Sequence, residues 1–224
     1  MGKDPGPVVP KFPRAELEAR AVRVLRPKTW VAPDVRLLDI EGRPAVLKDF
    51  APLPLATRLT IGLPLIRWEV PILRRLIGLE GVPQLLYTVD RFAFIMSFIE
   101  ARPLYKVPAA VLPAGIFDRV LDLVDAMHAR GVVHLDLRQR KNTLISGENR
   151  PVIIDFASAM HFAKDGKVFR FMKNVDRTAI LKLKNRVLPG SLTEAEKEQL
   201  RSFDKLRRFW PLKRRRPNLK DSIQ

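Results

Sequence analysis

Short apolar runs separated by polar turns dominate the first hundred residues of the chain. The run VRLLDI and the run PAVLKDF, within 35–50, are joined by Glu41-Gly42-Arg43, a composition that favours a tight turn between antiparallel strands. Two further runs, 84–89 and 92–99, have the length of buried strands. This half of the chain is therefore predicted to form an antiparallel sheet.

One segment of this half has a helical pattern instead. Apolar residues recur at helical spacing within 63–83, and the pattern stops at Gly78 and Gly81. Pro71 lies inside it, which leaves two alternatives: a helix kinked at the proline, or a helix that begins near Val70. The residues expected on the apolar face are Leu65, Trp68, Ile72, Leu73 and Leu76.

After a predicted break at 101–103 the pattern becomes mainly helical. A helix is predicted within 113–131, ending at the C-capping Gly131, with Ile116, Val120, Leu123, Val124 and Met127 on its apolar face. Two short buried strands are predicted at 143–146 and 151–156. Further helices are predicted at 176–187 and 192–210, and the second begins with a Thr193/Glu196 capping box.

This order of elements predicts an α+β fold with two lobes and a cleft between them. The expected units are a flexible arm at 1–13, a β-rich N-lobe at 14–100, a reduced helical C-lobe at 101–211 and a basic tail at 212–224. The longest apolar run, 92–99, is far below membrane-spanning length, and the N-terminus lacks the apolar core of a signal peptide.

Composition narrows the function classes. The 224 residues include no cysteine, which excludes disulfides, zinc thiolates and cysteine nucleophiles. The formal charge of +17 favours an anionic counterpart, and simple solubility is the alternative explanation. Three kinds of partner remain open on charge alone: nucleic acid, an anionic membrane surface, and a phosphorylated or acidic substrate.

Candidate chemistry is concentrated in HLDLRQRKNTLI, residues 134–145, and PVIIDFASAM, residues 151–160. Asp155 directly follows an apolar run, and a carboxylate buried there requires a partner or a metal ion. Phosphoryl transfer needs a metal, a carboxylate near the attacking hydroxyl and cations along the phosphates, and this chain offers each group.

The order and spacing of these motifs resemble the protein-kinase-like superfamily over roughly residues 35–160. HLDL resembles its catalytic loop, which implies that Asp136 orients the acceptor hydroxyl and that Arg138 contacts the transferred phosphate. Asn142 and Asp155 resemble the metal-binding Asn and the Asp of D-F-G, which implies ATP and Mg²⁺ as cofactors. In the nucleotide site, the resemblance implies phosphate contact by Lys48 from AVLKDF, an ion pair of Lys48 with Glu69, and adenine binding by the hinge from Ser97 to Ile99.

The chain also departs from that pattern. Four residues separate Leu137 from Asn142 where three are expected, and Ala157 replaces the glycine of D-F-G. No glycine-rich loop precedes Val35, so the phosphates are expected to be covered by other groups. The candidates are Arg23, Arg26 and Lys28.

The segment after Asp155 makes the resemblance more specific, because it is short. Only 69 residues follow Asp155, without an Ala-Pro-Glu tripeptide, as in the compact RIO-type kinases and the bacterial lipopolysaccharide-core (Kdo/heptose) kinases. Seven basic residues between Lys205 and Arg216 flank Phe209 and Trp210, which favours anionic headgroups.

The sequence therefore predicts an ATP- and Mg²⁺-dependent kinase that phosphorylates a lipopolysaccharide-type sugar or another anionic, membrane-associated acceptor. It is expected in the cytoplasm, at the inner face of the membrane. One alternative is a RIO-like serine/threonine kinase with a protein substrate. The other is a binding-only protein, either an ATP-binding pseudokinase or a basic RNA-associated scaffold.

Overall fold

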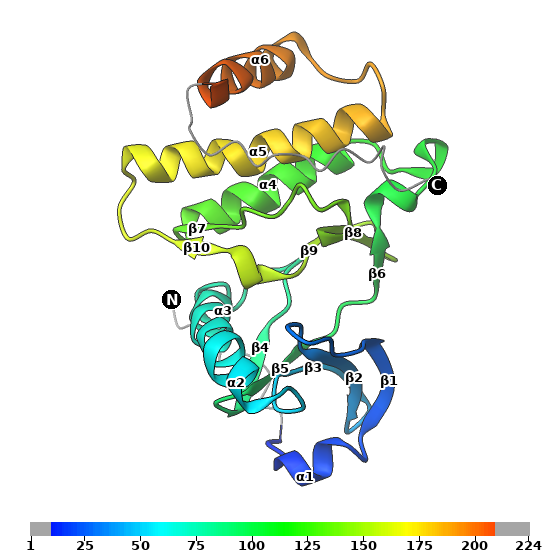
Figure 1. Cartoon of the computed structure of the whole chain (residues 1–224). Helices are drawn as coiled ribbons and strands as arrows, with labels where there is room; N and C mark the ends of the chain where they lie inside the picture. The colour runs from blue at the N-terminus through cyan, green and yellow to red at the C-terminus, as the bar shows by residue number, and fades with distance from the viewer. Residues whose placement is uncertain (1–9, 209–224) are drawn as a thin grey trace, which may run out of the picture.

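The N-lobe is a five-stranded antiparallel sheet with one long helix beside it (Figure 1). The structure, a computed structural model, describes residues 10–208. The strand order is β1-β2-β3-β5-β4. The bounds are β1 Ala21–Arg26, β2 Asp34–Ile40, β3 Arg43–Asp49, β4 Leu85–Asp90 and β5 Ala93–Ser97, with a short helix α1, Arg14–Leu17, before β1.

The predicted hairpin is confirmed. β2 pairs with β3 in continuous register from Asp34↔Asp49 to Ile40↔Arg43. Glu41 and Gly42 both have positive φ, 53° and 77°, as a two-residue turn of this hand requires. Because β3 also pairs with β5, it is buried between two neighbours, and this places Lys48 in the centre of the sheet.

The helical segment of the N-lobe is longer than predicted. It starts with α2, Leu55–Thr57, continues through a π-helical turn, Arg58–Gly62, and ends as α3, Leu63–Arg75. The alternative in which the helix begins near Val70 is therefore wrong, since Pro71 lies inside α3.

The expected apolar face of α3 is partly wrong. Ile66, Val70, Ile72 and Leu73 are buried, whereas Trp68 is 48% exposed. Its indole nitrogen instead donates a hydrogen bond to the Ala159 carbonyl.

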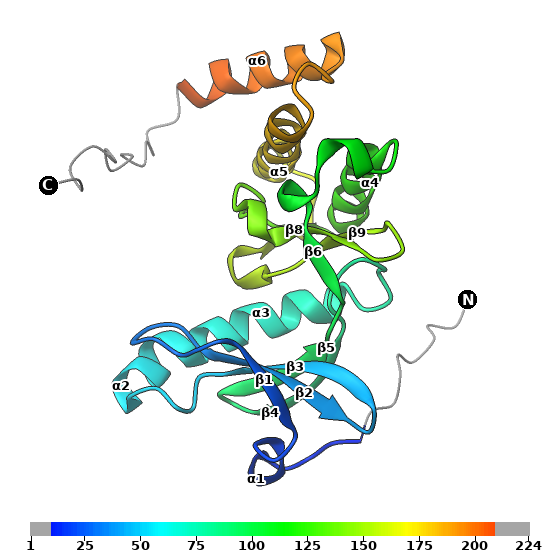
Figure 2. The same cartoon turned by 90° about the vertical axis from the view of Figure 1, so that its right-hand side faces the viewer.

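The C-lobe contains small sheets beneath three helices (Figure 2). One sheet has the order β6-β8-β9 and the other pairs β7 with β10. The strands are β6 Ala101–Pro103, β7 Val132–Val133, β8 Thr143–Ser146, β9 Pro151–Ile153 and β10 Met160–His161; the helices are α4 Ile116–Ala129, α5 Lys167–Val187 and α6 Glu194–Arg208; 3-10 turns cover Leu104–Lys106, Ala109–Val111, Arg140–Asn142 and Phe156–Ser158.

Three expected boundaries are wrong. The predicted break at 101–103 is strand β6, which pairs with β8, so the chain enters the C-lobe as a strand. Helix α5 begins at Lys167 rather than at Asp176. The second predicted strand also ends early, because Phe156 begins a 3-10 turn.

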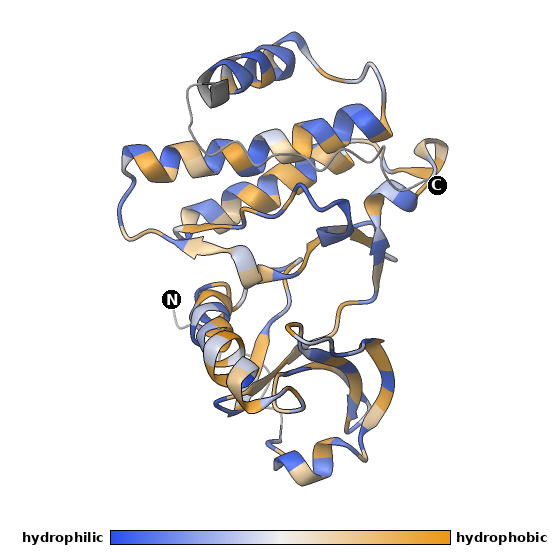
Figure 3. Cartoon of the chain, viewed as in Figure 1, coloured by the Kyte–Doolittle hydropathy of each residue, from blue (hydrophilic) through white to orange (hydrophobic). Residues whose placement is uncertain are grey.

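The helix predictions at α4 and α6 are confirmed where the structure describes them. All five residues predicted for the apolar face of α4 are buried, and its alternating colours in Figure 3 show the amphipathic pattern. At α6, the Thr193 amide donates to Glu196 Oε2 at 2.8 Å, and the Glu196 amide donates to Thr193 Oγ1 at 3.2 Å. These two bonds form the predicted capping box.

The two lobes share a hydrophobic core. Its buried members include Phe50 and Phe94 from the N-lobe and Ile153 and Phe156 from the C-lobe. The α+β, two-lobed architecture is thus present, with a sheet-rich lobe followed by a helix-rich lobe. The unit boundaries stay predictions, and the tail at 212–224 lies outside the described residues.

A glycine between α3 and β4 joins the lobes at close range. Gly81 has φ 83°, and its carbonyl accepts the Ile153 amide at 2.8 Å. A Cβ on Gly81 would lie 2.6 Å from the Pro151 carbonyl oxygen and 2.8 Å from Leu123. Both the backbone conformation and the space therefore require glycine here.

We expect Gly81→Ala to lower the free energy of unfolding by about 3 kcal/mol, because a left-handed conformation and a steric clash are combined. Gly78→Ala is the matched control, since Gly78 has φ 75° but open space around the Cβ position, and it should cost only about 1 kcal/mol. Urea unfolding of both variants measures the difference. Equal losses would show that the close approach at Gly81 contributes nothing.

Candidate active site

A buried ion pair lies where the two lobes meet. Lys48 Nζ on β3 is 2.6 Å from Glu69 Oε2 on α3, and both side chains are almost fully buried. Lys48 Nζ is also 3.9 Å from Asp155 Oδ1, which follows β9 in the C-lobe. The structure thus brings together three of the predicted site residues, and Pro71 does not prevent the pairing of Lys48 with Glu69.

The environment of Asp155 differs from that of the buried pair. Its side chain is 29% exposed, and its backbone has φ 68°, ψ 73°. A non-glycine residue in this region is strained, and such strain persists where the surrounding structure enforces it. Here the Ile154 amide donates to the Asn142 carbonyl at 3.1 Å, which fixes the chain directly before Asp155.

The second predicted carboxylate, Asp136, is positioned by its neighbours in the catalytic loop. Asn142 Nδ2 donates to the Asp136 backbone oxygen at 3.1 Å and to Asp136 Oδ2 at 3.2 Å. The Asp136 amide donates to His134 Nδ1 at 3.3 Å, and His134 Nε2 lies 3.0 Å from the Ile154 carbonyl. The extra residue in the loop therefore does not separate Asn142 from Asp136.

Burial raises the pKa of the Asp136 carboxyl above its ordinary value, and the nearby Asp155 charge acts in the same direction. The Asn142 hydrogen bond and the charge of Lys141 lower this pKa without reversing the net shift. A carboxylate with a raised pKa is a stronger proton acceptor. Asp136 is therefore suited to take a proton from a hydroxyl group.

Asp176 is a residue of this site that sequence reasoning missed. It is fully buried on α5, and its carboxylate accepts the backbone amides of His134 at 2.7 Å and Leu135 at 2.8 Å. His128 Nε2 lies 3.1 Å from the same carboxylate. Since Leu135 has φ 63°, Asp176 holds the strained start of the catalytic loop.

A signal for Asp176 is present in the sequence. The pattern DRTAILKLK places Asp176 four residues before Ile180 and seven before Leu183, so it shares their helical face. Ile180 and Leu183 are buried. A carboxylate on an apolar helix face is a buried charge that needs partners, and here the partners are main-chain amides.

The other predicted residues lie around this cluster. Arg138 is exposed in the catalytic loop. The Ser97 amide donates to the Gln84 carbonyl at 2.8 Å, and Ser97 Oγ accepts the Gln84 amide at 2.9 Å. Ile99 lies in the connection between β5 and β6. The adenine-binding role of Ser97 and Ile99 stays a prediction.

The proposed substitutes for a glycine-rich loop lie on or next to β1. Arg23 and Arg26 belong to this edge strand, and Lys28 follows it. Lys28 Nζ donates to the Pro52 carbonyl at 2.9 Å, so it is bound to the N-lobe backbone. Contact of these cations with phosphate stays a prediction.

A tryptophan connects α3 to the segment that follows Asp155. Trp68 Nε1 donates to the Ala159 carbonyl at 2.6 Å. Because Trp68 directly precedes Glu69, this bond ties the helix carrying Glu69 to the C-lobe. It explains why a large apolar side chain remains half exposed.

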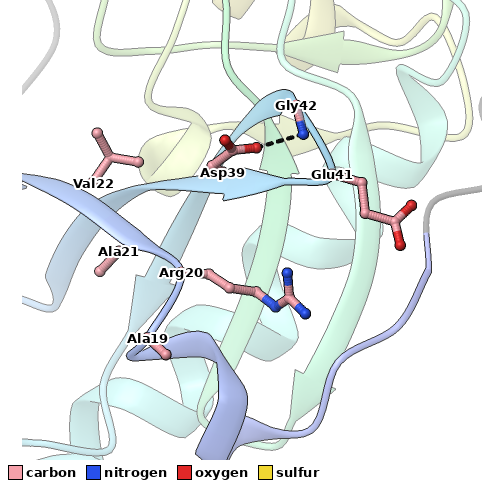
Figure 4. Close-up of a pocket in the computed structure, with 7 residues that line it drawn as sticks. All are labelled: Ala19, Arg20, Ala21, Val22, Asp39, Glu41 and Gly42. Atoms are coloured by element: carbon pink, nitrogen blue, oxygen red, sulfur yellow. Dashed lines mark hydrogen bonds between the residues drawn. The ribbon is translucent and has the colours of Figure 1, made fainter.

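A shallow pocket on the N-lobe contributes nothing to this cluster (Figure 4). It is formed by residues 19–22 and by the turn that joins β2 to β3, where Asp39 Oδ1 accepts the Gly42 amide at 2.6 Å. That turn is at the opposite end of β3 from Lys48.

Comparison with known proteins gives the family. A model of the RIO domain matches residues 63–187, more than half of the chain. The chain belongs to the RIO-domain family. The matched range contains α3 with Glu69, the catalytic loop, Asp155 and most of the C-lobe including Asp176. The predicted resemblance to RIO-type proteins is confirmed.

Solved structures support the fold of this RIO domain. One is the Rio2 kinase-ADP/Mg²⁺-phosphoaspartate complex from Chaetomium thermophilum, with TM-score 0.59 and 18% identity, covering 85% of this chain and 64% of that chain. Another is the Rio2 kinase from the same organism, with TM-score 0.55 and 17% identity, covering 87% and 75%. The predicted bilobal, protein-kinase-like fold is thus confirmed. No curated protein matches this chain.

We expect Asp176→Asn to lower the free energy of unfolding by about 3 kcal/mol, because one carboxylate accepts two buried amides. Hydrogen exchange should show lost protection at the His134 and Leu135 amides. The matched control is Asp204→Asn, which removes an exposed partner of Lys182 and should cost less than about 1 kcal/mol. Retained protection in Asp176→Asn would contradict the anchoring role.

Proposed function

We propose that this RIO-domain chain is an ATP- and Mg²⁺-dependent phosphotransferase whose acceptor is a hydroxyl group on protein. The observation that carries the proposal is Lys48, held between Glu69 of the N-lobe and Asp155 of the C-lobe. Asp155 in turn interacts electrostatically with Asp136, which is hydrogen-bonded to Asn142. The cluster unites a fixed cation, a candidate proton acceptor and oxygen ligands, which are the parts that phosphoryl transfer requires.

The residues present fit a magnesium nucleotide. Asn142 Nδ2 is used by Asp136, so its Oδ1 atom is the one available to a cation, beside the partly exposed carboxylate of Asp155. Mg²⁺ keeps several waters and takes substrate phosphates together with one or two protein ligands, a number that Asn142 and Asp155 can supply. The Rio2 structure similar to this chain is an ADP/Mg²⁺ complex.

Each residue of the candidate site then has a distinct role. Bound Mg·ATP would supply the phosphoryl group and neutralise its oxygens. Glu69 fixes the Lys48 ammonium where it can bind phosphate oxygens, while Asp155 and Asn142 supply oxygen ligands. Asp136 orients the acceptor hydroxyl and accepts its proton, and Arg138 offers a positive charge near the transferred group.

The choice of acceptor rests on the family. Membership in the RIO-domain family supports the protein-kinase alternative over a lipopolysaccharide sugar. The aromatic and basic residues 209–216 that favoured a glycolipid lie outside the described residues. Among the described helices, none has the length and apolar character to cross a membrane. We propose a cytoplasmic site of action, where ATP is supplied.

A binding-only scaffold is the remaining alternative. A pseudokinase usually lacks one of the catalytic groups, whereas Lys48, Asp136, Asn142 and Asp155 are all present here. Lys48 lies 3.9 Å from Asp155, and Asn142 donates a hydrogen bond to Asp136. The raised pKa of Asp136 also suits a proton acceptor. These features support an enzyme.

The test is transfer from γ-labelled ATP with Mg²⁺, offering soluble protein extract and membrane glycolipid side by side. We expect label in protein, and a loss of about 10²-fold or more in Asp136→Ala and Asp155→Ala. The matched control is Asp122→Ala, an exposed position on α4, which should retain the activity.

Hydroxylamine treatment of the labelled protein shows which kind of group carries the phosphate. Phosphate on a hydroxyl group resists hydroxylamine, whereas an acyl phosphate on aspartate is cleaved. This check is needed because the similar Rio2 structure is a phosphoaspartate complex. Label confined to glycolipid would support the sugar-kinase interpretation instead. ATP binding without label in any fraction would contradict the proposed activity.

A further inference from the structure

Five exposed cations surround the catalytic loop on two segments that are distant in sequence. Arg138, Arg140 and Lys141 belong to the loop itself, and Arg102 and Lys106 belong to β6 and the turn after it. Resting on the proposed function, we propose that these five residues, the acceptor-side basic surface, bind an acidic peptide whose hydroxyl group is phosphorylated.

The fold brings the two segments together. β6 pairs antiparallel with β8, with Arg102 opposite Ile145, and β8 begins directly after Asn142. The 3-10 turn at 140–142 packs beside the turn at 104–106. The Arg140 guanidinium lies 4.8 Å from the centre of the Tyr105 ring, a cation–π contact that holds this side chain against the second segment.

These cations lack acidic partners in the described part of the chain. None of the five is within 4 Å of a carboxylate oxygen there, whereas many other cations of the fold are paired, such as Arg14 with Asp49 and Lys184 with Glu196. The segments 100–106 and 136–141 together contain two acidic residues, Glu100 and Asp136, against these five basic ones. The surface therefore has a net positive charge that an acidic ligand would neutralise.

The surface adjoins the candidate catalytic carboxylate. Lys141 directly precedes Asn142 in the catalytic loop. The Asn142 side chain, next to Lys141, donates to Asp136. A peptide whose hydroxyl contacts Asp136 would place its neighbouring residues over these cations, within the range at which exposed charges interact.

An acidic peptide fits this surface better than RNA. Proteins that bind single-stranded nucleic acid combine cations with aromatic rings on which bases stack. In these two segments the sole aromatic residue is Tyr105, and the Arg140 guanidinium lies over its ring. The surface thus provides charge without a free stacking platform.

The test compares two synthetic peptides that carry one serine flanked by four aspartates or by four asparagines. We expect kcat/KM to favour the aspartate peptide about tenfold or more. The triple variant Arg102→Gln/Lys106→Gln/Arg140→Gln should reduce that preference to about twofold, with KM for ATP unchanged. Arg138 and Lys141 stay unaltered because they act on the catalytic groups directly.

The control is Arg43→Gln/Arg119→Gln, which removes two exposed cations without salt bridges in the described residues and should keep the preference. Equal kcat/KM for both peptides, or a preference that survives the triple variant, would overturn the inference while the kinase activity stands. If no peptide is phosphorylated, anisotropy of the labelled peptides still tests the surface, since binding must favour aspartate and depend on the three cations. Preferential binding of an RNA oligonucleotide through the same residues would overturn the peptide assignment.

Discussion

The buried ammonium of Lys48 is the constraint on which the rest of this molecule depends. A charge removed from water needs a partner at close range, and deleting one member of such a pair typically costs about 3–5 kcal/mol. Glu69 supplies the partner from α3, and Asp155 approaches from the other lobe. One ammonium group therefore contacts side chains from the sheet, the helix and the C-lobe. The Trp68 bond to Ala159 and the contact of Gly81 with β9 hold the same lobe junction.

The C-lobe has an analogous central group with the opposite charge. Asp176 has no exposure to water, and its oxygens accept amides from a catalytic loop whose Leu135 has positive φ. Helix α5 thus carries more than apolar packing, because it fixes the backbone from which Asp136 and Asn142 extend.

Much of the fold and site can be predicted because the relevant signals are local. The β2–β3 hairpin can be predicted from the turn residues Glu41-Gly42. The candidate site residues can be predicted because their motifs follow one another along the chain in the order typical of kinases. The pairing of Lys48 with Glu69 follows from the resemblance to kinases. Features that depend on distant contacts were missed. Strand β6 has only three residues and is defined by pairing with β8, about forty residues later. The exposed Trp68 reflects a hydrogen bond to residue 159, not its helical period. The position of Asp176 on an apolar helix face indicates a buried carboxylate, but the pattern does not show which groups it binds, because its partners are distant backbone amides.

Direct measurement of nucleotide affinity tests the central claim, that Lys48 is held at the lobe junction in order to bind phosphate. Calorimetric titration of Mg·ATP should compare the unaltered chain, Lys48→Met and, as a matched control, Lys182→Met on the exposed side of α5. The account predicts that Lys48→Met weakens binding at least about tenfold while Lys182→Met leaves it unchanged. Equal affinity in all three, with each protein folded, would contradict it.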